Sequence, residues 1–252
     1  MTRVGVSGAA GRMGRLVAEA VAAAPGLDLV AGYDPAGAGQ IVAGITLSDD
    51  PAVLGAAAVV VEFTTPAAVE ANLARWRSMG LNAVVGTSGF DAARLAALRA
   101  AWGSGPPNCL VVPNFSIGAV LMMRFAAAAA PHFAAAEIVE LHHDRKADAP
   151  SGTALATAAG MAAAGGRQER AVESAEALAG ARGAAADGVR VHAVRLPGLL
   201  AHQEVILGSP GETLTIRHDT TDRAAFLPGV LLAIRGVAAL PDPVTVGLEA
   251  VL

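Results

Sequence analysis

Lysine is almost absent from this chain of 252 residues, although cationic side chains are not. The sequence contains 17 arginines and 60 alanines but a single lysine, Lys146. A uniform preference for alanine, and for arginine over lysine, reflects coding bias more than chemistry. The position of the one lysine therefore needs an explanation of its own.

Cysteine and net charge are also scarce. The single Cys109 excludes an intramolecular disulfide framework and a thiolate zinc cluster, and we interpret it as a small buried hydrophobe. A formal net charge of −4 with scattered arginines disfavours nucleic-acid binding, which needs a basic face. An apolar fraction of 54% argues against disorder, and the length allows one or two domains.

Long hydrophobic runs are missing. The longest uncharged stretch, 100–123, is interrupted by glycines and prolines, so we expect no membrane span. A glycine-rich segment from Gly8 stands where a signal peptide would have its apolar region. We therefore expect a cytoplasmic protein.

The first part of the chain alternates between strand and helix patterns. Short apolar runs predict strands at 4–7, 27–33, 58–61, 82–85 and 109–112. Helical spacing after Gly14, a helix from Pro66 to about Met79, and one capped by Asp91 fill the intervals. Unbroken apolar strands are typical of sheets buried on both faces. Residues 1–113 are thus predicted to form an α/β, Rossmann-type domain with a doubly wound parallel sheet.

The pattern changes after Asn114. An alanine-rich helix at 117–130 and a strand at 137–142 precede a helix from Ser151 and three strands at 189–196, 202–207 and 212–218. Strands without intervening helices predict a second, α+β domain with a mixed or antiparallel sheet over 114–221. We expect 165–188, which is poor in large apolar residues, to be exposed and mobile. An amphipathic helix near 222–237 is expected to complete the first domain over 222–252.

A glycine-rich turn, Gly8-Ala-Ala-Gly-Arg-Met-Gly14, follows the first strand and precedes a helix. Small residues there let the backbone approach a pyrophosphate at a helix N-terminus. Asp34 ends the next strand 20 residues after Gly14, where it would accept hydrogen bonds from an adenine ribose. No basic residue follows Asp34 directly, which favours NADH, but Arg12 could reach a phosphate, so NADPH stays open. Alternatively, Arg12 and Arg15 are solvated charges.

The densest polar cluster lies at 140–153, where a strand is expected to end and a helix to begin. It combines the imidazoles of His142 and His143, the ammonium of Lys146 and a helix start at Ser151 that could bind an anion. Such groups suit a small carboxylate substrate and a proton donor.

Simpler interpretations of this cluster remain open. Asp148 could only cap the helix, and Arg145 could only be a surface charge. A zinc site at His142, His143 and Asp144 is disfavoured because adjacent residues rarely converge on one metal and no H-E-x-x-H pattern is present. We predict no metal site.

Five segments together resemble 4-hydroxy-tetrahydrodipicolinate reductases, also called dihydrodipicolinate reductases. They are the loop at 8–14, GTSGF at 86–90, PNFSIG at 113–118, ELHHDRKADAPSGT at 140–153 and RHDTTDR at 217–223. The resemblance covers nearly the whole chain, the stretch at 140–153 is its most specific part, and 192–247 looks most like actinobacterial members.

The resemblance implies an enzyme of lysine and diaminopimelate biosynthesis, typically a homotetramer, that reduces a small cyclic dicarboxylate with NADH or NADPH to tetrahydrodipicolinate. By motif position, His142 matches the proton donor and Lys146 its catalytic partner. Matches to substrate contacts are His143, Ser151, Gly152, Thr153 and Arg223, although the charge of Arg223 could equally serve domain packing. Matches to cofactor contacts are Gly8, Gly11, Arg12, Met13, Asp34, Gly86, Thr87, Asn114 and Phe115.

Two other functions use some of the same features. Another two-domain nicotinamide dehydrogenase, acting on an amino or hydroxy acid, would share the glycine loop and Asp34 but would not explain the cluster at 140–153. A nucleotide-sensing regulatory protein would leave His142 and Lys146 without a role, and would need a DNA-binding element that the sequence does not reveal.

Overall fold

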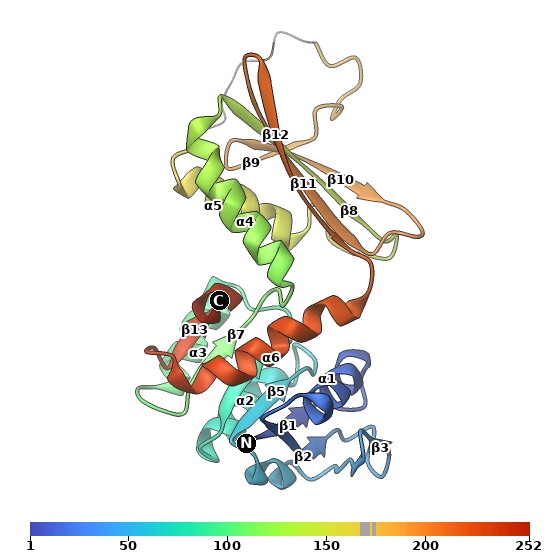
Figure 1. Cartoon of the computed structure of the whole chain (residues 1–252), viewed down its shortest axis with the longest axis vertical. Coiled ribbons are helices and arrows are strands. Elements are labelled where there is room, and N and C mark those ends of the chain that lie inside the picture. The colour runs from blue at the N-terminus through green and yellow to red at the C-terminus, as the bar shows by residue number, and fades with distance from the viewer. Residues whose placement is uncertain (167–171, 173–174) are drawn as a thin grey trace. The chain divides into compact units, whose positions relative to one another are not determined.

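The computed structural model describes residues 1–166, 172 and 175–252, which form two compact units (Figure 1). Unit 1 comprises residues 1–117 and 226–252, and unit 2 comprises residues 118–225. No helix in the described ranges is long and apolar enough to cross a membrane.

Unit 1 contains a six-stranded sheet in which every neighbouring pair of strands is parallel. Its order is β13-β7-β6-β5-β1-β2. The strands are β1 (Thr2–Ser7), β2 (Leu27–Tyr33), β5 (Val59–Glu62), β6 (Asn82–Val85), β7 (Cys109–Val111) and β13 (Val244–Val246). The sheet confirms the predicted parallel α/β architecture, and β13 is an edge strand that the sequence analysis did not predict.

Helices cover the sheet of unit 1 in two pairs. Helix α1 (Arg12–Ala23) contacts α6 (Leu227–Gly236), and α2 (Val69–Ser78) contacts α3 (Ala92–Trp102). The second pair buries Trp76 and Trp102 in a cluster with residues of β5, β6 and β7. Burial of aromatic and branched side chains against the sheet supplies most of the driving force for this packing.

Two predicted helix starts in unit 1 are wrong by a few residues. Helix α2 begins at Val69 rather than Pro66, because Thr65 O first accepts hydrogen bonds from the N–H groups of Ala68 and Val69 in a turn. Helix α6 begins at Leu227 after a 3₁₀ turn, η3 (Arg223–Phe226), because a proline favours the first helical turn. The predicted N-cap Asp91 is confirmed, since its side chain accepts a hydrogen bond from Arg94 N.

Short elements complete unit 1. They are the hairpin of β3 (Ile41–Val42) and β4 (Ile45–Thr46), and the 3₁₀ helices η1 (Pro51–Ala56), η4 (Val237–Ala239) and η5 (Leu248–Val251). Cys109 is a buried free thiol, as predicted.

Unit 2 packs two helices against one side of a five-stranded mixed sheet (Figure 1). The sheet order is β12-β11-β8-β10-β9, with β8 and β10 parallel and the other pairs antiparallel. The elements are α4 (Ile117–Ala129), η2 (Ala130–His132), β8 (Ala135–His142), α5 (Gly152–Ala163), β9 (Ala184–Ala186), β10 (Val189–Arg195), β11 (Ala201–Ser209) and β12 (Glu212–Thr220). The mixed sheet predicted for the second domain is confirmed.

The alanine-rich helices of unit 2 pack closely on branched strand residues. Ala126, Ala154 and Ala158 are fully buried against a layer that includes Ile138 and Val205. Strand β9 lies in the segment 165–188, for which no regular structure was predicted, and it pairs with the edge of β10. Within that segment, the expectation of mobility for 167–171 and 173–174 lies outside the described residues.

Candidate active site

The glycine loop of unit 1 lies against the neighbouring strand ends so closely that a side chain has no room. Gly8 has φ +81°, and a Cβ built on it would lie 2.4 Å from Phe63 O. A Cβ on Gly14 would lie 2.0 Å from Gly8 O. Glycine is therefore required at both positions for steric reasons, and at Gly8 also for its left-handed backbone.

The loop leads into α1, whose N-terminus is open to an anion. Gly11 is the N-cap and offers no side-chain hydrogen bond to the first turn, which contains Arg12 and Met13. The first N–H groups of a helix have no partner within the helix, and they attract a phosphate. The residues present thus fit the pyrophosphate of a nicotinamide dinucleotide.

Asp34 ties the end of β2 to the glycine loop. Its Oδ2 accepts a hydrogen bond from Ala10 N at 2.9 Å, and its Oδ1 accepts one from Ala36 N at 3.0 Å. Each carboxylate oxygen has a second lone pair, so hydroxyl groups of a ribose can still donate to it. Of the two arginines in α1, Arg15 is half-buried and donates a hydrogen bond to Ala10 O at 2.9 Å, so it is not fully solvated. Arg12 is exposed to solvent.

Four residues that follow parallel strands gather at the carboxyl edge of the sheet. Gly8 packs on Phe63 O after β5, and a Cβ on Gly86 would lie 2.2 Å from the Phe63 ring. The ring centroids of Phe63 and Phe115 are 5.5 Å apart. The carboxyl edge is where open α/β sheets bind ligands. Phe63 was missed in the sequence, although its place directly after a buried strand was a usable signal.

Hydrogen bonds hold the same edge in place. Thr87 Oγ1 donates to Glu62 O at 3.3 Å, and Asn114 Oδ1 accepts from Ser116 N at 2.9 Å. The fully buried Glu62 carboxylate accepts from Trp76 Nε1 at 2.8 Å and also from Asn72 and Thr64. These bonds fix the orientation of the side chains at this edge of the sheet.

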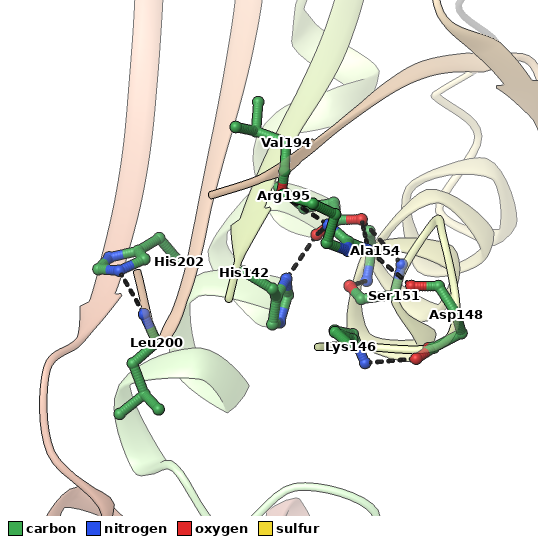
Figure 2. A network of polar contacts seen from close by, with 10 residues as sticks. His142, Lys146, Asp148, Ser151, Ala154, Val194, Arg195, Leu200 and His202 are labelled. Carbon is green, nitrogen blue, oxygen red and sulfur yellow. Dashed lines mark hydrogen bonds and ion pairs between the residues drawn. The ribbon is translucent and has the colours of Figure 1, made fainter. Parts of the chain in front are cut away.

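The polar cluster of unit 2 is organised by a carboxylate, Glu140, that has no solvent exposure. It lies on β8 two residues before His142, so both side chains are on the same face of the strand. Four hydrogen bonds reach it: from His142 Nδ1 (2.5 Å), Arg195 Nη1 (2.9 Å), Arg195 Nη2 (2.8 Å) and Ser151 N (3.1 Å) (Figure 2). Three separate elements therefore meet at one carboxylate.

Burial and neighbouring charges act in opposite directions on the pKa values of Glu140 and His142. Burial raises the pKa of Glu140, but the hydrogen bonds and charge of Arg195 and His142 outweigh burial and hold that pKa below its usual value. Burial lowers the pKa of His142, and the attraction of Glu140 offsets this only in part. Glu140 is thus an anion and His142 a neutral imidazole at pH 7. A carboxylate only accepts, so His142 carries its proton on Nδ1.

The other nitrogen of His142 is available. Among the residues that the structure describes, none forms a hydrogen bond with His142 Nε2. The side chain of His142 is 14% exposed, and Nε2 is not among the buried polar atoms that lack a partner, so this nitrogen reaches the surface. A ligand that reaches Nε2 would find an unused proton acceptor or, after protonation, a proton donor.

Lys146 lies in the loop between β8 and α5. Its Nζ donates to Asp148 Oδ1 at 2.7 Å, which lowers the pKa of Asp148 (Figure 2). The alternative that Asp148 caps α5 is wrong, because Ser151 is the N-cap and its Oγ accepts from Ala154 N at 3.2 Å. Arg145 is exposed, in agreement with a surface charge.

The remaining predicted substrate residues differ in their setting. Gly152 and Thr153 form the first turn of α5 beside Ser151. Nδ1 of His143 is buried without a hydrogen-bond partner among the described residues. Arg223 lies in η3, after β12, and no hydrogen bond joins it to the described part of the cluster at 140–153. In the described ranges there is no group of three or more His, Cys, Asp and Glu residues that could hold a metal ion.

Arg195 is a member of the cluster that was not predicted from the sequence. It lies 55 residues from Glu140 and reaches it because β10 runs parallel to β8 with Arg195 opposite His142. A charged residue at the end of a predicted strand was the one available signal.

Comparison with known proteins agrees with this geometry. A family model described as "Dihydrodipicolinate reductase, N-terminus" matches residues 2–115, and "Dihydrodipicolinate reductase, C-terminus" matches residues 118–252. The chain belongs to the dihydrodipicolinate reductase family. Its two family segments meet close to the boundary between unit 1 and unit 2 at residue 117.

Members of this family are similar over the full length of the chain. The 4-hydroxy-tetrahydrodipicolinate reductase of Beutenbergia cavernae is 53% identical over 99% of this chain and 98% of its own, and that of Thermobifida fusca is 53% identical over 100% and 99%. The dipicolinate-bound dihydrodipicolinate reductase of a Paenisporosarcina species superposes with a TM-score of 0.88 at 35% identity, over 100% of both chains. A probable dehydrogenase from Thermotoga maritima, 11% identical with a TM-score of 0.64, shares the fold alone.

Proposed function

We propose that this chain reduces 4-hydroxy-tetrahydrodipicolinate (dihydrodipicolinate) to tetrahydrodipicolinate with NADH or NADPH, in lysine and diaminopimelate biosynthesis. The observation that carries the proposal is the connected network of His142, Glu140 and Arg195 beside Lys146 and the start of α5. A dehydrogenase of amino or hydroxy acids would explain unit 1 but not this network. Curated relatives about half identical over the full chain support the same reaction.

In this proposal unit 1 holds the nicotinamide dinucleotide, which supplies the hydride. The loop residues Gly8, Gly11, Arg12 and Met13 bind its pyrophosphate, and Asp34 binds the adenine ribose. At the carboxyl edge of the sheet, Gly86, Thr87, Asn114 and Phe115, together with Phe63, support the nicotinamide end. We favour NADH, or use of both cofactors, because no basic residue follows Asp34 directly.

Unit 2 holds the substrate. His143, Ser151, Gly152 and Thr153 bind its carboxylates at the N-terminus of α5, where backbone N–H groups and the helix dipole favour an anion. The related Paenisporosarcina structure, described as dipicolinate bound, shows that a relative binds a planar dicarboxylate. Arg223 is proposed as a further substrate contact on the strength of its place in the family motif alone.

His142 and Lys146 are the residues proposed to transfer the proton to the substrate. Hydride addition to a C=C–C=N system leaves negative charge that an acid must neutralise, and general acid catalysis contributes about 10²–10⁴-fold. The two carboxylates of the substrate bring negative charge near the neutral His142, which favours the protonated imidazole. The substrate thus helps to create its own proton donor, and the ammonium of Lys146 stabilises the developing charge.

A coupled assay tests the function. The purified chain is mixed with the upstream synthase, pyruvate and aspartate semialdehyde, and the oxidation of NADH and of NADPH is followed separately. We expect oxidation only when synthase, both of its substrates and this chain are present. No oxidation with either cofactor would refute the proposed function. Activity on a panel of amino or hydroxy acids instead would favour the other class of dehydrogenase.

The assembly is proposed on the family resemblance. We expect a homotetramer, and sedimentation equilibrium at micromolar concentration measures the molar mass directly. A monomer or dimer under those conditions would contradict this part of the proposal.

A further inference from the structure

We propose that Glu140 and Arg195 are positioning residues that hold His142 in one tautomer, with the proton on Nδ1 and Nε2 left for the substrate. The inference rests on the proposed function, because it assigns His142 a proton to transfer. It concerns two residues that do not touch substrate in this scheme and act through the imidazole.

The Glu140 carboxylate is saturated by donors from three directions. His142 comes from the same strand, Ser151 N from the start of α5 and Arg195 from β10. Both of its oxygens accept two hydrogen bonds. A fully occupied anion cannot turn to another partner, so the imidazole has one orientation and one tautomer.

Arg195 makes this buried anion tenable. Its Nη1 and Nη2 form a bidentate pair with the carboxylate, at 2.9 and 2.8 Å. An unpaired carboxylate without solvent exposure would take up a proton and cease to be a pure acceptor. Arg195 therefore keeps Glu140 ionised, and through it keeps the proton of His142 on Nδ1.

Arg195 also fixes the loop that carries Lys146. Its Nη2 donates to Asp148 O at 2.7 Å, and its Nη1 donates to Val194 O at 2.7 Å. The carboxylate of the same Asp148 pairs with Lys146. One guanidinium thus sets the positions of the imidazole, the ammonium and, through Glu140, the first residue before α5 (Figure 2).

Glu140→Gln is a nearly isosteric test of this arrangement. With the amide oxygen in the place of Oε1, Ser151 N and Arg195 Nη2 keep their acceptor. The amide NH₂ group then takes the place of Oε2 and faces His142 Nδ1 and Arg195 Nη1, of which Arg195 Nη1 still donates to Val194 O. The imidazole must then accept at Nδ1 and carry its proton on Nε2. The variant therefore reverses the tautomer without emptying the site.

The charged groups that act on His142 are Glu140 on its own strand, Lys146 in the following loop and Arg195 on β10. Its partner on β11 is Ala201, which carries no charge. Glu140 raises the pKa of His142, so its removal lowers that pKa. The alkaline limb of the activity profile of Glu140→Gln should move to lower pH.

A matched control lies on the same strand. Glu137, on the opposite face of β8 and 33% exposed, also pairs with an arginine and a histidine, Arg182 and His192. Glu137→Gln removes a comparable Glu–Arg–His cluster and should leave turnover, KM and pH profile as in the wild-type protein. Molar mass is measured for both variants, so that a change of assembly is recognised.

The experiment combines kinetics with ¹⁵N NMR of the histidines, at a pH where His142 is neutral. We expect Nδ1–H in the wild-type protein, Nε2–H in Glu140→Gln, and a fall in kcat of at least about tenfold with KM for substrate within about threefold. An unshifted pH profile with wild-type kcat, or the same His142 tautomer in both proteins, would overturn the proposal.

Two further variants guard against misfolding. Glu140→Asp keeps a carboxylate and should retain the Nδ1–H tautomer and the alkaline limb, with part of the turnover. Arg195→Lys keeps the charge but loses the bidentate pair. This variant should lower kcat by a larger factor than the factor by which it changes KM. The tautomer is measured without substrate, so an inactive wild-type protein with the expected tautomers would refute the proposed function alone. An Nε2–H tautomer in an active wild-type protein would refute the positioning proposal alone.

Discussion

The glycine loop gives a prediction in which the backbone and packing contributions can be separated. Gly8 and Gly26 have nearly the same φ, +81° and +82°, so replacement by alanine meets the same backbone strain at both. That strain is worth about 1–2 kcal/mol for a residue other than glycine. A Cβ on Gly26 meets nothing within 4 Å, whereas one on Gly8 would lie 2.4 Å from Phe63 O. Overpacking of this kind adds about 1–3 kcal/mol.

We therefore expect Gly26→Ala to lower the free energy of unfolding of unit 1 by about 1–2 kcal/mol, and Gly8→Ala by about 2–5 kcal/mol. The two tryptophans, Trp76 and Trp102, are both buried in unit 1, so their fluorescence during urea unfolding reports on the unit that contains both glycines.

Binding of the cofactor is measured on the same two variants. Gly8→Ala should raise the Kd for NADH at least about tenfold, equivalent to about 1.4 kcal/mol, because the displaced loop no longer presents its backbone to the pyrophosphate. Gly26→Ala should leave that Kd unchanged. Equal losses of stability and equal Kd values for the two variants would refute the close packing of Gly8 on Phe63 as the reason for glycine.

Four further predictions follow from single side chains. Lys146→Arg should lower turnover at least tenfold, because a planar guanidinium does not replace a compact ammonium, whereas Arg145→Lys should have no effect; equal turnover would remove the specific role of the lysine. Asp34→Ala should raise the KM for NADH and narrow the difference between the KM values for NADH and NADPH. An unchanged ratio of these two KM values would show that Asp34 does not bind the ribose. Burial raises the pKa of the Cys109 thiol, so a disulfide reagent should react only after unfolding, and rapid reaction in native buffer would contradict its burial. The pKa of Glu140 in the folded protein lies below its unfolded value of about 4.3, so the stability that this group contributes is full above that value and is lost as the pH falls. The free energy of unfolding of Glu140→Gln should therefore depend less on pH in the acid range than that of the wild-type protein.

The parallel sheet of unit 1 could be predicted because its strands are apolar runs separated by clear turn and cap signals. Three short strand pairings were missed, and each depends on a neighbour rather than on its own residues. Strand β13 has three residues and forms only by joining β7, and β9 forms by joining the edge of β10. A two-residue strand such as β3 carries no periodicity at all.

The candidate site was predictable where its residues are contiguous. The stretch from Glu140 to Thr153 combines a strand end, a polar loop and a helix start, and the structure joins His142, Glu140 and Ser151 through hydrogen bonds. The contribution of Arg195 was not predictable, because it arises from pairing between strands that are far apart in the chain. Asp148 was open to a capping role until the structure showed its pairing with Lys146.

The lysine that the sequence retains has a local physical setting. Lys146 lies in a loop that Arg195 anchors through Asp148 O, and its side chain is only 22% exposed, whereas the neighbouring Arg145 is exposed. A short ammonium fits there beside the carboxylate of Asp148.

We propose that the cluster on unit 2 performs the chemistry while unit 1 binds the cofactor. Turnover in the coupled assay and the Kd for NADH, measured together for Lys146→Ala and His142→Ala, test it most directly. We predict that turnover falls at least about tenfold in each variant while the Kd for NADH stays within about twofold of the wild-type value. Wild-type turnover in both variants would contradict the claim.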